Sequence, residues 1–163
     1  MPRAPEPGDA GERDLLTGWL AFHRDALAAK CDGLTAEQLT EASAPPSDLS
    51  LLGLVRHLTE MERVYLVYAL GGGTFSLVYC TDEAPEADIA GLTPDMGASS
   101  LHAWLAERQA ADRLLSATSS LDELGAGNRR SVRWNLLKLI GEYARHNGHA
   151  DLIRERIDGA TGE

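Results

Sequence analysis

Residues 132–157 read VRWNLLKLIGEYARHNGHADLIRERI and carry the strongest helical pattern in the chain. Apolar side chains recur there at alternating spacings of four and three residues, which is the period of one inward-facing side of a helix. The series is Val132, Leu136, Leu139, Tyr143, His146, Ala150, Ile153 and Ile157, and His146 is its only imidazole. The pattern predicts a long amphipathic helix whose buried side includes one histidine.

Three other segments have the same apolar period. We expect a first helix from Glu12 to the turn before Gly33, a second over residues 51–70 and a third over residues 100–118. The second is strongly apolar and is followed by three glycines, a frequent helix stop. Four long helices without a convincing strand pattern predict an all-α protein, a four-helix up-and-down bundle.

The connections between these helices carry recognisable signals. Thr35 followed by Gln38 predicts a capping box for a short helical turn, and Pro45-Pro46 then predicts a loop. Ser50 is the expected N-cap of the second helix, and Ser99 or Ser100 that of the third. Residues 74–97 form a long crossover between these two helices, and long ordered loops often lie near function.

The bulk composition favours a single globular unit. The chain has 163 residues, enough for one core. We expect the Pro- and Gly-rich residues 1–11 to form a flexible arm and residues 12–163 to form one bundle domain. A net charge of -10 disfavours binding to nucleic acid or to an anionic membrane surface. With no membrane-length apolar run and no signal peptide, a cytoplasmic location is expected, and Cys31 and Cys80 are expected to be free thiols.

Polar residues on the apolar sides of two helices suggest a metal site. Glu142 lies one helical turn before His146, so the two side chains share one face. His57 is the polar member of an apolar series on the second helix that also contains Leu54, Met61, Val64 and Tyr68. Buried polar groups without partners are costly, and one divalent ion would satisfy His57, Glu142 and His146 together.

Simpler interpretations of the same residues stay open. A Glu and a His four residues apart often make only a surface contact. His57 could be a core histidine bonded to a backbone carbonyl, with Glu60 as its partner from a more exposed edge. His23 also falls on an apolar series and could support the site or be a hydrogen-bonded core residue, whereas His102 is expected to be exposed.

Two histidines and one carboxylate, with positions left for water, suit a catalytic divalent ion. Zinc is the first expectation, and nickel, iron and manganese accept the same ligands. No residue stands out as a general base.

The segments LSLLGLVRHLTEMERVY and EYARHNGHADLIRERI resemble the DinB-like, YfiT-like metal-binding superfamily over nearly the whole chain after the arm. The resemblance implies a four-helix bundle in which His57, Glu142 and His146 hold a divalent metal in a surface pocket. A glutamate at position 142, in place of the histidine of many members, is similar to the branch that includes mycothiol-dependent maleylpyruvate isomerase.

By resemblance, that branch implies a metal that activates a low-molecular-weight thiol such as mycothiol for S-transfer or isomerisation. His149, Glu60 and Arg145 would then orient the ligands or the substrate. Two other functions remain open. One is a non-catalytic metal- or ligand-binding stress-response module, and the other is an interaction protein with exposed Trp19, Phe75 and Tyr79. Homodimerisation is compatible with all three.

Overall fold

The computed structural model describes residues 4–161 and consists of helices joined by loops. The first three residues of the expected arm and the last two of the expected domain lie outside this range. Within residues 4–161 the structure contains no β-strand, which confirms the all-α prediction. The long helices are α1 (Glu12–Cys31), α3 (Leu51–Glu62), α5 (Gly97–Ala117) and α6 (Val132–Asp158).

Shorter elements extend or connect these helices. The second long helix continues from α3 through a π-helical turn, η1 (Arg63–Tyr68), to α4 (Ala69–Gly71). The turn α2 (Ala36–Thr40) begins with the predicted capping box of Thr35 and Gln38. A 3-10 turn, η2 (Pro94–Met96), leads directly into α5.

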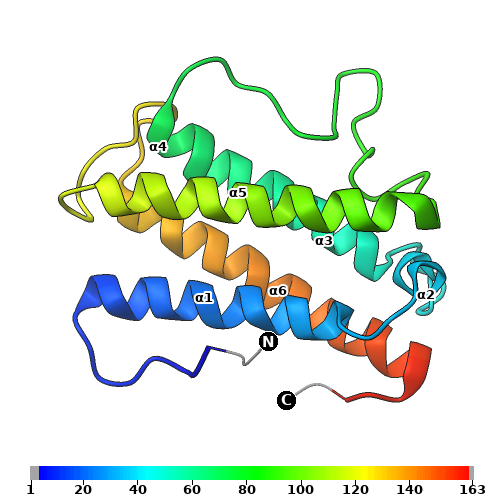
Figure 1. Cartoon of the computed structure of the whole chain (residues 1–163). Helices are drawn as coiled ribbons and strands as arrows, with labels where there is room; N and C mark the ends of the chain where they lie inside the picture. Colours follow the sequence, from blue (N-terminus) through cyan, green and yellow to red (C-terminus); the bar gives the residue numbers. More distant parts are fainter. Residues whose placement is uncertain (1–3, 162–163) are drawn as a thin grey trace.

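Helices α3 and α5 run in the same direction, which differs from the strict alternation of an up-and-down bundle. Near the start of both helices, Arg56 donates to the Ser100 hydroxyl at 3.3 Å. About two turns later on both helices, Arg63 forms an ion pair with Glu107. Contacts that advance together along both helices require parallel packing. Residues 72–93, which connect the two, therefore run back along the outside of the bundle (Figure 1).

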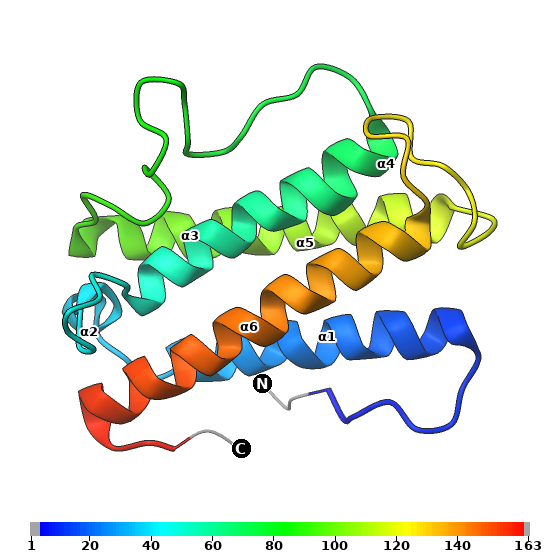
Figure 2. The same cartoon turned by 180° about the vertical axis from the view of Figure 1, so that it is seen from behind.

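Helix α6 lies between α1 and α3, as Figure 2 shows. It is antiparallel to α3, because Tyr143 bonds to Glu62 while the earlier Trp134 contacts the later Tyr65. Its start pairs with the start of α1 through Arg133 and Glu12. The two helices therefore run parallel to each other. This arrangement places the middle of α6 against the middle of α3.

The core lies between the four long helices and contains the predicted inward-facing side of α6. Leucines from α1, α3 and α6 supply most of it, and burying each stabilises the fold by about 1.5–3 kcal/mol. Its largest fully buried members are Leu20, Leu27, Leu51, Leu52, Leu54, Leu58, Leu66, Trp104, Leu136, Leu139 and Tyr143.

Of the three predicted N-caps, Thr35 and Ser50 are confirmed and the third is wrong. Ser50 accepts a hydrogen bond from the Gly53 amide and is the N-cap of α3. Ser99 and Ser100 are not caps, because α5 already begins at Gly97. The preceding turn of η2 supplies the first helical geometry, so both serines lie inside the first turn. The first helix ends at Cys31, before Gly33, as predicted.

The described part of the N-terminal arm lies along α1. The amide of Ala4 donates to the Asp25 carboxylate at 3.1 Å. Pro7 approaches Gly18 so closely that a Cβ atom there would be 2.9 Å from the proline Cβ. None of the helices in residues 4–161 combines the length and apolar character required to cross a bilayer.

Candidate metal site

His57 reaches the candidate site because most of α3 is buried and its second turn faces α6. The Ser50 cap starts the helix, and the crossover packs against Gly53, where a Cβ would be in ordinary contact with the Ile89 Cα at 3.5 Å. The His57 ring lies edge-on to the His146 ring, with centroids 4.6 Å apart. The two imidazoles, which were predicted to face a shared interior from separate helices, therefore lie in contact.

Glu142 and His146 lie one turn apart on α6 and contact each other. The His146 Nε2 atom is 3.7 Å from Glu142 Oε2. The other carboxylate oxygen, Oε1, accepts a hydrogen bond from Lys138 Nζ at 3.1 Å, one turn earlier. One oxygen of Glu142 thus faces the histidines while the other is held by a lysine.

His57, Glu142 and His146 form a compact donor set. One ligand atom from each lies within 4.8 Å of the other two. Ligand atoms around a tetrahedral ion at roughly 2.1 Å are roughly 3.4 Å apart, so modest side-chain rotation would bring the three to bonding distance. The side chains are 25%, 12% and 15% exposed, respectively. The group is therefore reachable from solvent, and its donors fit a divalent metal ion.

The electrostatics of His146 favour the neutral, ligating form. Burial lowers the pKa of His146 to about 4, and the nearby imidazoles of His57 and His149 act in the same direction. The Glu142 carboxylate opposes this effect but does not reverse it. Near neutral pH His146 therefore has a free lone pair.

Asp88, from the crossover, is a site residue that the sequence analysis missed. Its Oδ2 atom lies 2.9 Å from His57 Nδ1, and the residue is only 7% exposed. Burial opposes ionisation, but hydrogen bonds from His57 and Cys80 hold the pKa of the Asp88 carboxyl below its usual value. The crossover was expected to lie near function, yet no spacing rule connects position 88 with position 57.

Glu60 was expected at a more exposed edge of the helix, but the structure buries it. It is 1% exposed, and its carboxylate accepts hydrogen bonds from the backbone amides of Val78, Tyr79 and Cys80 at 2.6–3.0 Å. Its role in the structure is to hold the crossover on α3. Asp88, not Glu60, is the carboxylate that contacts His57.

The other histidines and the arginine named in the sequence analysis differ in how they relate to the donor set. His149 is exposed, and its Nδ1 atom is 3.4 Å from His146 Nδ1. Arg145 is exposed and acts on His146 through its charge. His23 lies on α1, where Asn147 donates to its backbone carbonyl at 3.0 Å. His102 is exposed, as predicted.

The aromatic residues of the alternative interaction protein are mostly covered by neighbouring side chains. Trp19 packs against Phe22 within α1. Tyr79 is covered by the guanidinium of Arg56, 3.7 Å from its ring centroid. Of the three proposed residues, only Phe75 is exposed, at 49%.

Both cysteines are free, as expected, and neither is poised to be a thiolate. Burial raises the pKa of the Cys31 thiol to about 12. Burial also raises the pKa of Cys80, and the nearby Asp88 charge adds to this effect. A nucleophilic thiolate at the candidate site would therefore have to come from another molecule.

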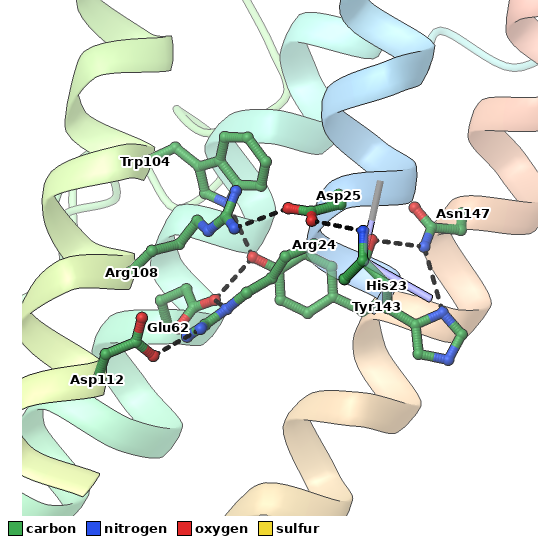
Figure 3. Close-up of polar contacts among 10 residues, drawn as sticks. His23, Arg24, Asp25, Glu62, Trp104, Arg108, Asp112, Tyr143 and Asn147 are labelled. Carbon is green, nitrogen blue, oxygen red and sulfur yellow. Dashed lines mark hydrogen bonds and ion pairs between the residues drawn. The ribbon is translucent and has the colours of Figure 1, made fainter. Parts of the chain in front are cut away.

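A buried polar network supports the ligand-bearing part of α6 (Figure 3). Arg24 donates to both oxygens of Glu62, at 2.7 and 2.6 Å. The Tyr143 hydroxyl donates to the same carboxylate at 2.7 Å and accepts from Trp104 Nε1 at 2.7 Å. Tyr143 immediately follows Glu142, so this network fixes the segment that carries two of the three donors.

The helical fold and the match to a family model together place the chain among the all-α proteins of the DinB-like superfamily. A family model described as mycothiol-S-transferase matches residues 15–159, which is nearly the whole chain. The chain therefore belongs to the mycothiol-S-transferase family. No curated protein and no solved structure matches it.

Proposed function

We propose that this protein is a divalent-metal-dependent thiol S-transferase that uses mycothiol or a closely related small thiol. Its metal would be held by His57, Glu142 and His146, with zinc as the first choice and nickel, iron or manganese as alternatives. The observation that carries the proposal is the meeting of these three donors within 4.8 Å in a chain of the mycothiol-S-transferase family.

The chain's own residues are suited to holding such an ion. His146 is neutral near pH 7, and the Glu142 carboxylate balances part of the charge of a dication. Three protein donors leave coordination positions free, as catalytic sites require. A divalent ion there would act as a Lewis acid that lowers the pKa of a bound thiol and makes its thiolate available near neutral pH.

The chemistry that follows is attack by the cosubstrate thiol on an electrophile. The sulfur forms a new bond to the electrophilic carbon while the bond from that carbon to its leaving group breaks. The leaving group departs with the bonding electron pair, and the thiol proton passes to solvent. Cys80 does not supply this sulfur, because the pKa of its thiol is raised. Arg145 and His149 are exposed next to His146 and are the candidates for contacting the substrate.

The proposal is tested by measuring thiol consumption and product formation with mycothiol and a panel of electrophiles. Zinc-loaded wild-type protein, His57→Ala and His102→Ala are compared. His102 is an exposed histidine of α5, so its replacement controls for the loss of an imidazole. We expect His57→Ala to lower the rate by about 10²-fold or more, and His102→Ala to behave as wild type.

A different result would favour the non-catalytic module. Metal would then raise the melting temperature of the wild type, while no thiol and electrophile pair gave protein-dependent product. Equal rates for His57→Ala and wild type would contradict the role of His57.

A further inference from the structure

The middle of the crossover is held on α3 by polar contacts rather than lying free. Glu60 accepts the three backbone hydrogen bonds described above, and Arg56 donates to the Ala87 carbonyl at 2.7 Å. Arg56 also covers the Tyr79 ring. Residues 78–88 therefore have a defined position relative to the helix turn that carries His57.

Asp88 lies at the end of this fixed segment and contacts His57 directly. The contact joins Asp88 Oδ2 and His57 Nδ1 at 2.9 Å. Because an ionised carboxylate can only accept, a His57 ring with one proton carries that proton on Nδ1 in this contact. The lone pair is then on Nε2, the ring nitrogen available to a metal ion.

The carboxylate is itself restrained. The Asp88 side chain is only 10% exposed, and the nearby Cys80 helps to hold the pKa of its carboxyl below the usual value. Cys80 is in turn attached through its backbone amide to Glu60. The orientation of the His57 ring is thus determined by a crossover segment about thirty residues away in sequence.

We propose that Asp88 is a positioning residue that selects the His57 tautomer and raises the affinity of the site for its divalent ion. This inference rests on the proposed metal-dependent function. Carboxylates that accept from the far nitrogen of a ligating histidine fix its ring and increase its basicity, and their loss typically costs 10–100-fold in metal affinity.

The test measures zinc dissociation constants, by competition with a chromogenic chelator, for the wild type, Asp88→Ala, Asp88→Asn and Glu86→Gln. Glu86→Gln is the matched control, because it removes one exposed carboxylate from the same loop. Asp88→Asn retains the size and one acceptor oxygen of the native side chain, so it tests the charge without opening a gap.

We expect Asp88→Ala to raise the dissociation constant by about 10–100-fold. Asp88→Asn should cause a smaller rise, and Glu86→Gln should match the wild type. A second readout is the His57 tautomer, observed by long-range ¹H–¹⁵N NMR in the metal-free protein. The wild type should show a protonated Nδ1, and Asp88→Ala a mixture of tautomers.

Two failures are distinguishable. If the wild type binds zinc but Asp88→Ala binds it equally tightly and keeps the same tautomer, the role of Asp88 is refuted and the proposed function stands. If the wild type does not bind zinc or any other of the candidate ions, the proposed function and this inference fail together.

Discussion

Glu62 is a charged side chain with no exposed surface, and its contacts explain how the bundle tolerates it. Arg24 and Tyr143 occupy its carboxylate oxygens, as described above. Burial alone would lower the pKa of Arg24, but the adjacent Glu62 carboxylate raises it above its usual value. The Arg24 guanidinium is therefore charged, and it depends on the Glu62 carboxylate because a buried unpaired ion is strongly destabilising.

Replacing Glu62 with Gln should lower the free energy of unfolding by about 3–5 kcal/mol, because the buried Arg24 guanidinium loses its charged partner. Asp112→Asn is the matched control, since Asp112 pairs with the same arginine but is 59% exposed. It should cost less than about 1 kcal/mol. Urea unfolding measures both, and similar losses in the two variants would contradict the assigned role of Glu62.

At the residue scale, the sequence predicts the three donors but not their surroundings. His57, Glu142 and His146 are visible because each interrupts or borders an apolar helical series. Asp88 is in a loop, where side-chain direction follows no period. Glu60 lies within one turn of His57 and was left open as its partner, but the crossover amides bind its carboxylate instead.

The end of the second long helix shows how a loop can fix a helix terminus. Gly127 donates its amide to the Ala69 carbonyl of α4 at 3.0 Å. A Cβ atom on Gly127 would be 2.2 Å from the Tyr68 carbonyl oxygen, and one on Gly125 would be 2.2 Å from that of Ala69. The loop before α6 can therefore dock on α4 only because these two residues lack side chains.

Gly127→Ala should lower the free energy of unfolding by about 1–3 kcal/mol, because the added methyl group would displace backbone. Gly141→Ala provides the opposite case, since Gly141 is in α6 and a Cβ there meets nothing within 4 Å. It should stabilise the protein by about 0.5–1 kcal/mol through helix propensity. Thermal and urea unfolding measure the change in stability of both variants. An unchanged free energy of unfolding for Gly127→Ala would refute the close docking of the loop on α4.

At the scale of elements, the capping signals predict the helix start correctly where no other helical turn precedes the capping residue. Ser50 and the Thr35–Gln38 pair belong to this group. The start of α5 was misplaced because a 3-10 turn precedes it and lets the helix begin at Gly97. The π-helical turn η1 was also missed, since one extra residue in a turn hardly disturbs the apolar pattern of so buried a helix.

At the scale of the molecule, the sequence predicts the four long helices but not their directions. Short loops force neighbouring helices to be antiparallel, whereas a long connection allows either direction. Residues 72–93 could span roughly 70 Å when extended, more than twice the roughly 31 Å length of a helix over residues 51–71. The crossover therefore has enough chain to return along the bundle and place α5 parallel to α3.

This topology matters for the candidate site. It leaves α3 and α6 as antiparallel neighbours whose middle turns carry His57 on one side and Glu142 with His146 on the other. It also brings the crossover across α3, where Asp88 reaches His57. The site is thus assembled from three parts of the chain that are distant in sequence.

The central claim is that these three side chains hold one divalent ion. Its most direct test is elemental analysis of untagged protein purified without added metal, compared with the His57→Ala, His146→Ala double variant. We expect close to one equivalent of a divalent metal per wild-type chain and nearly none in the variant. An equal metal content in the two proteins, whether near zero or near one, would contradict it.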